Sequence, residues 1–168
     1  MDPFAVLGVE PSLSLDAGAL ERRYRELLRV LHPDKHTQKP AAERRVMLER
    51  ATEVTEAFRI LSDDVRRAEA VLRARGVSFD EQDREQDGEL LMAMMEFRER
   101  IAEARAARDG AALAALKEEA AKERGAVLAE LETADAASVK AAAQLGRLRY
   151  YQRLLSDIDA AESLLEGD

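Results

Sequence analysis

Cysteine is absent from the sequence. The chain can therefore form no disulfide and can hold no cysteine-ligated zinc ion or iron–sulfur cluster of its own. Aromatic residues make up only 4% of the chain, which predicts thin cores stabilised by helix packing. The first residues lack the basic and apolar regions of a signal peptide, and no apolar run approaches the length of a membrane span. We therefore expect a cytoplasmic protein that does not interact with membranes.

Proline is also scarce, with four residues, whereas the helix-favouring residues Ala, Leu, Glu and Arg dominate. The expected fold class is therefore all-α, and 168 residues suffice for two small domains. Charge differs between the two parts: residues 1–75 contain 14 Lys/Arg and 13 Asp/Glu, whereas residues 76–168 contain 12 and 21. The acidic balance and the scarcity of aromatic residues argue against nucleic-acid binding.

Capping residues and apolar periodicity divide the chain into two helical parts. The helices expected in the first part are 2–8, a helix capped by Asp16 and stopped by Pro33, 42–61 and 65–75. Val46 is expected on or near the inner side of the third helix, and a buried stripe on the second comprises Leu20, Tyr24, Leu27, Leu28 and Leu31. A polar linker, 76–88, precedes long helical patterns at 89–108, 111–132 and 135–166. Three long helices with short connections predict an antiparallel three-helix bundle over 89–168.

The most specific feature of the first part is the loop triplet His32-Pro33-Asp34, which follows an arginine-rich helix. A carboxylate on a loop fixed by proline is preorganised to pair with an arginine of a partner. A histidine at a helix C-terminus is favoured by the helix dipole, and an arginine row can meet an acidic patch. The candidate residues are His32, Pro33, Asp34, Lys35, Arg22, Arg23, Arg25 and Arg29.

This context resembles a J-domain. The opening signature of that family is similar to Asp2-x-Phe4-x-x-Leu7-Gly8-Val9. Its second helix and the following loop resemble the segment from Leu20 to Lys35. The end of its third helix resembles Ala57-Phe58-x-x-Leu61-Ser62-Asp63. The resemblance implies a helical hairpin within residues 1–75. It also implies that the loop, above all Asp34, docks on the ATPase domain of a DnaK-type chaperone and favours ATP hydrolysis. The arginines and Lys35 would then steer the encounter.

Other interpretations of these residues stay open. An arginine run on a helix is usually a solvated face, and the same arginines could contact nucleic acid. His32 and His36 are four residues apart and could form a metal pair. Pro33 breaks the helix that would align them, however, and the chain has no third histidine. We therefore expect no metal site and no cofactor.

The stretch 89–103 places two kinds of residue on opposite sides of one helix. The side expected to face the bundle core carries Leu90, Met94, Phe97 and Ile101. The opposite side carries Met92, Met95, Glu96, Glu99 and Glu103, and Leu91 lies between the two. Because methionine adapts to varied surfaces, this pattern favours a partner-binding face whose glutamates meet a basic patch. Alternatively, the two methionines pack on the first domain or on a second copy of the chain.

Three further segments resemble the HscB family of J-domain co-chaperones, so the likeness covers the whole chain. They are Arg67-Ala68-Glu69 before Leu72 and Gly76, Leu91-Met92-x-x-Met95-Glu96-x-Arg98-Glu99, and Leu148-Arg149-Tyr150-Tyr151-x-x-Leu154. In that family this face binds the iron–sulfur scaffold IscU. The matching positions imply a site of Leu91, Met92, Met95, Glu96, Glu99, Glu103 and Tyr150. Tyr150 stands where the family often has phenylalanine, so its hydroxyl needs a partner. The lack of an N-terminal cysteine-rich extension favours a bacterial form.

The expected function is that of a monomeric adaptor without catalysis of its own. By resemblance, it holds an IscU-type scaffold on the bundle and presents it to an HscA/DnaK-type chaperone, whose ATPase it stimulates. A J-domain co-chaperone with a different client is the alternative. A small enzyme is disfavoured, because the sequence offers no nucleophile–base pair, no glycine-rich phosphate loop and no clustered metal ligands.

Overall fold

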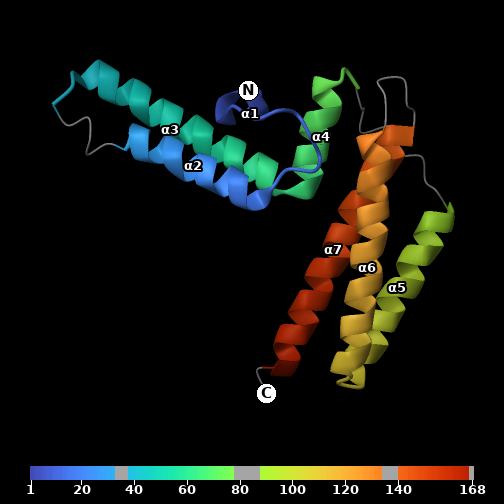
Figure 1. Cartoon of the computed structure of the whole chain (residues 1–168). Coiled ribbons are helices and arrows are strands. Elements are labelled where there is room, and N and C mark those ends of the chain that lie inside the picture. The colour runs from blue at the N-terminus through green and yellow to red at the C-terminus, as the bar shows by residue number, and fades with distance from the viewer. Residues whose placement is uncertain (33–37, 78–87, 134–139, 167–168) are drawn as a thin grey trace. The chain divides into compact units, whose positions relative to one another are not determined.

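The computed structural model describes residues 1–32, 38–77, 88–133 and 140–166. These residues form seven helices and no strand, so the prediction of an all-α protein is confirmed. The chain divides into two compact units, Met1–Gly76 and Val77–Asp168 (Figure 1). Within the described ranges, no helix is long and apolar enough to cross a membrane. Most of the expected linker, 76–88, lies outside those ranges.

The first unit is a helical hairpin with two short helices against it (Figure 1). Its helices are α1 (Pro3–Leu7), α2 (Ala17–Leu31), α3 (Ala41–Ser62) and α4 (Asp64–Ala74). Across the hairpin, the rings of Tyr24 and Phe58 stack with centroids 4.2 Å apart. The buried apolar side chains include Phe4, Leu7, Leu20, Val54, Ala57, Leu61, Val71 and Leu72. Of the predicted α2 stripe, only Leu20 is fully buried, because one partner helix covers this face of α2.

Aspartates start three of these helices, as their side chains accept hydrogen bonds from free backbone N–H groups of the first turn. Asp2 accepts from Phe4 N at 3.0 Å, and Asp16 accepts from Ala19 N at 2.5 Å. Asp63 caps α4 in the same way. Gly8 ends α1 with φ +66°, a left-handed conformation that glycine adopts without steric cost. A side chain at Gly8 would also crowd the guanidinium of Arg23, 3.2 Å from the added carbon.

The prediction that Val46 faces inward is wrong, since its side chain is 50% exposed. The hairpin geometry explains the error. Tyr24 and Phe58 lie opposite each other in the hairpin, and α2 ends at Leu31, about two turns after Tyr24. On the antiparallel α3, the same distance of two turns from Phe58 extends only as far as Ala51. The first turns of α3 therefore run beyond the end of α2 (Figure 1). Leu48, on this same overhang, is likewise 60% exposed.

The second unit is a bundle of α5 (Gly88–Ala106), α6 (Gly110–Glu132) and α7 (Lys140–Glu166) (Figure 1). The predicted bounds agree except at α7, where the expected first residues fall in 134–139, outside the described ranges. Asp109 caps α6 by accepting from Ala112 N at 2.9 Å. The core consists mainly of aliphatic side chains, among them Ile101, Leu113, Leu116, Leu154 and Ile158.

Candidate partner-binding sites

The loop that carries the histidine–proline–aspartate triplet begins where α2 ends. Helix α2 stops at Leu31, and His32 follows in an extended conformation with an exposed side chain. Pro33, Asp34, Lys35 and His36 lie outside the described residues. The structure thus places the start of this loop at the C-terminus of the arginine-rich helix, as the sequence predicts. The roles of the loop residues stay predictions.

All four α2 arginines are exposed, and three of them share one side of the helix. Arg22, Arg25 and Arg29 are spaced by three and four residues, which brings them together on a helix surface. Arg25 also donates to the carboxylate of Glu21 at 2.6 Å, an exposed pair that contributes little to stability. These three residues form what we call the α2 basic row.

Arg23 does not belong to the basic row. Its Nε donates to the carbonyl oxygen of Leu7 at 2.9 Å and so ties α2 to the last turn of α1. Its guanidinium also lies 3.8 Å from the carboxylate of Glu26. The sequence predicted a steering role for Arg23, but the structure shows this side chain bonded within the unit. Its sequence neighbours could not reveal this, because Leu7 is far away along the chain.

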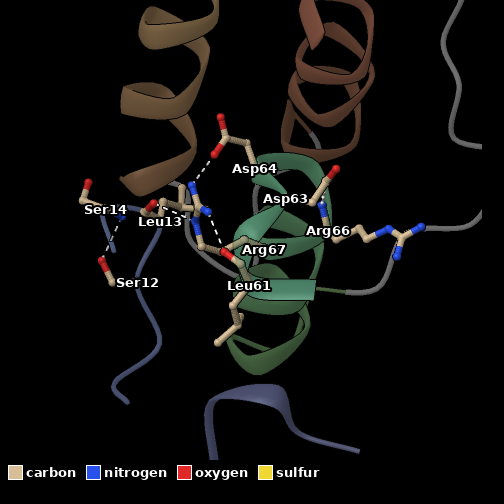
Figure 2. Close-up of polar contacts among 8 residues, drawn as sticks. All are labelled: Ser12, Leu13, Ser14, Leu61, Asp63, Asp64, Arg66 and Arg67. Atoms are coloured by element: carbon tan, nitrogen blue, oxygen red, sulfur yellow. Dashed lines mark hydrogen bonds and ion pairs between the residues drawn. The ribbon is translucent and has the colours of Figure 1, made fainter. Parts of the chain in front are cut away.

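Arg67 is a buried charged residue whose importance the sequence did not predict. Its guanidinium donates to the carbonyl oxygens of Leu13 at 2.9 Å and Leu61 at 2.7 Å, and it pairs with the carboxylate of Asp64 (Figure 2). The residue is 9% exposed. One side chain therefore joins the loop before α2, the end of α3 and the start of α4. By contrast, the side chain of Arg66 points away from this cluster (Figure 2).

The outer side of α5 gathers the six residues that the sequence assigns to the second site there. Leu91 is 56% exposed, and Met92 and Met95 are each 65% exposed. The three glutamates on this side, Glu96, Glu99 and Glu103, are exposed as well. On the inner side, Phe97 and Ile101 are buried in the bundle. We call these six exposed residues the α5 outer face.

Tyr150, the seventh residue assigned to this site, lies on α7 and is only 6% exposed. Its hydroxyl donates to the backbone carbonyl oxygen of Met94 at 3.2 Å, which supplies the partner that a buried hydroxyl requires. Burial raises the pKa of Tyr150 to about 12, while the nearby Arg98 acts in the opposite direction. The contribution of Tyr150 to the scaffold-binding site stays a prediction. This hydrogen bond links α7 to α5.

Ion pairs link α5 and α7 to α6. Arg100 donates to both carboxylate oxygens of Glu119, at 3.0 and 2.7 Å, and this pairing lowers the pKa of Glu119. Lys117 of α6 bonds Asp159 at 2.6 Å and Glu162 at 2.7 Å on α7, and the two carboxylates raise the pKa of Lys117. Both helices of the second unit that flank α6 are thus joined to it by ion pairs as well as by the apolar core.

Comparison with known proteins links both units to one family. The sequence profile described as "DnaJ domain" matches residues 2–70, and the one described as "HSCB C-terminal oligomerisation domain" matches residues 86–159. A "Co-chaperone protein HscB homolog" of Pseudoalteromonas atlantica is 32% identical over 172 residues, covering 98% of each chain. This chain belongs to the HscB family of co-chaperones. The resemblance inferred from the motifs is therefore confirmed.

Other HscB proteins extend the comparison. The solved structure "Chaperone HscB from Vibrio cholerae" superposes with a TM-score of 0.83 at 28% identity, over 98% of this chain and 99% of that one. An Arabidopsis thaliana protein named "Iron-sulfur cluster co-chaperone protein HscB homolog" is 38% identical over 104 residues, which are 62% of this chain and 41% of that protein. The chain thus has the J-domain and the C-terminal domain of an HscB co-chaperone.

Proposed function

We propose that this HscB-family chain delivers an IscU-type iron–sulfur scaffold to an HscA/DnaK-type chaperone in the bacterial cytoplasm and stimulates the ATPase of that chaperone. The observation that carries the proposal is the α5 outer face. It presents three large apolar side chains to solvent, whereas Phe97 and Ile101 of the same helix are buried in the bundle core. Exposed apolar patches of this kind are typical of protein-binding surfaces.

The chemistry of the α5 outer face defines the surface that it can bind. Met92 and Met95 have flexible side chains that adapt to an apolar partner surface. Glu96, Glu99 and Glu103 follow them along the helix and favour a partner surface with lysines or arginines. A scaffold bound here would therefore combine an apolar contact with a basic patch, and added salt would slow its association.

The first unit provides the second contact of the adaptor. The α2 basic row and the loop after His32 are the features by which a J-domain would engage a chaperone ATPase domain. Arg22, Arg25 and Arg29 offer three exposed cations to an acidic surface, while Asp34 would pair with an arginine of the chaperone. We assign the chaperone contact to residues 1–75 and the scaffold contact to residues 89–168. Because one chain carries both sites, the bound scaffold would reach an effective concentration of about a millimolar at the chaperone.

Calorimetric titration of the full chain with an IscU-type scaffold tests this proposal. Replacing Met92 and Met95 together by alanine is expected to weaken binding by about 30-fold, because removing two buried interface side chains costs about 2 kcal/mol. The fold should persist, since both side chains are 65% exposed in the structure.

The matched control for this titration is the Val46→Ala/Leu48→Ala double variant. It removes two apolar side chains of similar exposure, 50% and 60%, from the first unit. Its affinity for the scaffold should stay within about twofold of that of the unchanged chain. No scaffold binding by the unchanged chain, or equal loss in both double variants, would contradict the proposal.

A further inference from the structure

A groove lies between α5 and α7, on the side of the bundle next to the α5 outer face. Its volume is about 320 Å³. Its lining comes from two turns of each helix and consists of Arg98, Ile101, Ala102 and Arg105 on α5, and Asp157, Ala160, Ala161 and Leu164 on α7. We call this region the α5–α7 groove.

Small side chains create the groove, and the larger part of its lining surface is apolar. Three of the eight lining residues are alanines, so the facing surfaces of α5 and α7 do not fill the space between them. Leu164 stands at one end of the groove and is 64% exposed. A lone exposed leucine on a surface would be ordinary. An exposed leucine beside an apolar groove offers a partner a continuous contact.

The charge at the groove is opposite to that of the domain around it. Residues 77–168 contain 12 Lys/Arg and 21 Asp/Glu, yet the groove carries Arg98 and Arg105 against Asp157 alone. Neither arginine forms an ion pair with any residue in the described part of the chain. One helix, α5, therefore displays glutamates on its outer face and arginines at the groove.

The groove is continuous with the α5 outer face. Leu91, Met95, Arg98, Ala102 and Arg105 follow one another at spacings of four, three, four and three residues. Residues at these spacings form one stripe along a helix. The stripe starts among the exposed apolar residues of the outer face and ends at the groove. Arg98 also acts electrostatically on Tyr150, which places it on the α7 side of α5.

We propose that the α5–α7 groove is a second contact region for the same scaffold, and that it takes an acidic segment with apolar side chains. This inference rests on the proposed function. The apolar side chains of the segment lie over Ala102, Ala161 and Leu164, and its carboxylates pair with Arg98 and Arg105. The scaffold surface that meets α5 is thus basic opposite the glutamates and acidic opposite the groove. This alternation fixes the orientation of the scaffold on the helix.

Titration of an IscU-type scaffold into the full-length Arg105→Glu variant tests the groove, with Lys122→Glu as the matched control. Both substitutions reverse one exposed charge on a helix of the second unit, but Lys122 does not line the groove. Arg105→Glu is expected to weaken binding by about tenfold and Lys122→Glu by less than about twofold. Leu164→Ala, which leaves the charge unchanged, is expected to weaken binding by about threefold.

The outcomes separate the groove from the proposed function. In one outcome, the unchanged chain binds the scaffold, the Met92→Ala/Met95→Ala variant does not, and Arg105→Glu has the same affinity as Lys122→Glu. This outcome overturns the groove proposal and leaves the proposed function standing. If the unchanged chain does not bind the scaffold, both fail.

Thermal melts of each variant are required to match that of the unchanged chain within a few degrees. Arg105 lies in the last turn of α5, where a negative charge is unfavourable to the helix dipole. If Arg105→Glu is destabilised for this reason, Arg105→Gln replaces it and is expected to weaken binding by about threefold. An unchanged affinity of Arg105→Gln together with an unchanged affinity of Leu164→Ala overturns the groove proposal.

Discussion

Replacing Asp34 by asparagine is expected to reduce stimulation of the chaperone ATPase by about 10- to 100-fold. The substitution keeps the size of the side chain and removes the negative charge that would pair with an arginine of the chaperone. A hydrogen bond to a charged group contributes about 1.5–3 kcal/mol, and every 1.4 kcal/mol corresponds to about tenfold. Single-turnover ATP hydrolysis by a DnaK-type chaperone, measured at increasing concentrations of the variant, gives the size of the effect.

Glu10→Gln is a suitable control for Asp34→Asn. Glu10 is exposed and lies in the same unit, so its replacement removes one carboxylate charge without touching the loop after α2. Stimulation by this variant should equal that of the unchanged chain. If Asp34→Asn stimulated the ATPase as well as the control does, the assignment of the loop as the chaperone contact would be wrong.

Replacing Arg67 by alanine is expected to destabilise the first unit by about 3 kcal/mol, because removing one partner of a buried ion pair leaves the other uncompensated. Asp64 would lose its cation, and the carbonyl oxygens of Leu13 and Leu61 would lose their donors. For a unit of this size the midpoint of thermal unfolding should fall by more than about 10 °C. Circular dichroism melts measure this change.

Arg66→Ala is the matched control for Arg67→Ala. Arg66 precedes Arg67 on α4, but its side chain is exposed and points to solvent (Figure 2). Only its backbone N–H takes part in the cap, by donating to Asp63 at 2.9 Å. The control should melt within about 2 °C of the unchanged chain. Equal melting temperatures for the two variants would show that the Arg67 cluster does not stabilise the unit.

Features that depend on local sequence could be predicted. The cap at Asp16 and the stop after Leu31 follow from the hydrogen-bonding needs of helix ends. The division of α5 into an inner side with Phe97 and an outer side with Met92 follows from the helical period alone.

Features that depend on contacts between distant residues could not. Val46 fits the apolar period of α3, but the length of α2 decides whether it is covered. Arg67 and Arg23 occur in runs of arginines, and only the positions of the Leu13 and Leu7 carbonyls distinguish them from their solvated neighbours. The resemblance placed Tyr150 in the scaffold site, but only the packing of α5 on α7 shows that its side chain is buried.

The central claim is that scaffold and chaperone are brought together because one chain binds both. The most direct test mixes two variants in equal amounts, Asp34→Asn and Met92→Ala/Met95→Ala, and measures chaperone ATP hydrolysis with the scaffold present. Each variant retains one site. The account predicts that the mixture fails to reproduce the scaffold-dependent stimulation given by the unchanged chain, since scaffold and chaperone are then held on different molecules. Stimulation by the mixture equal to that by the unchanged chain would contradict it.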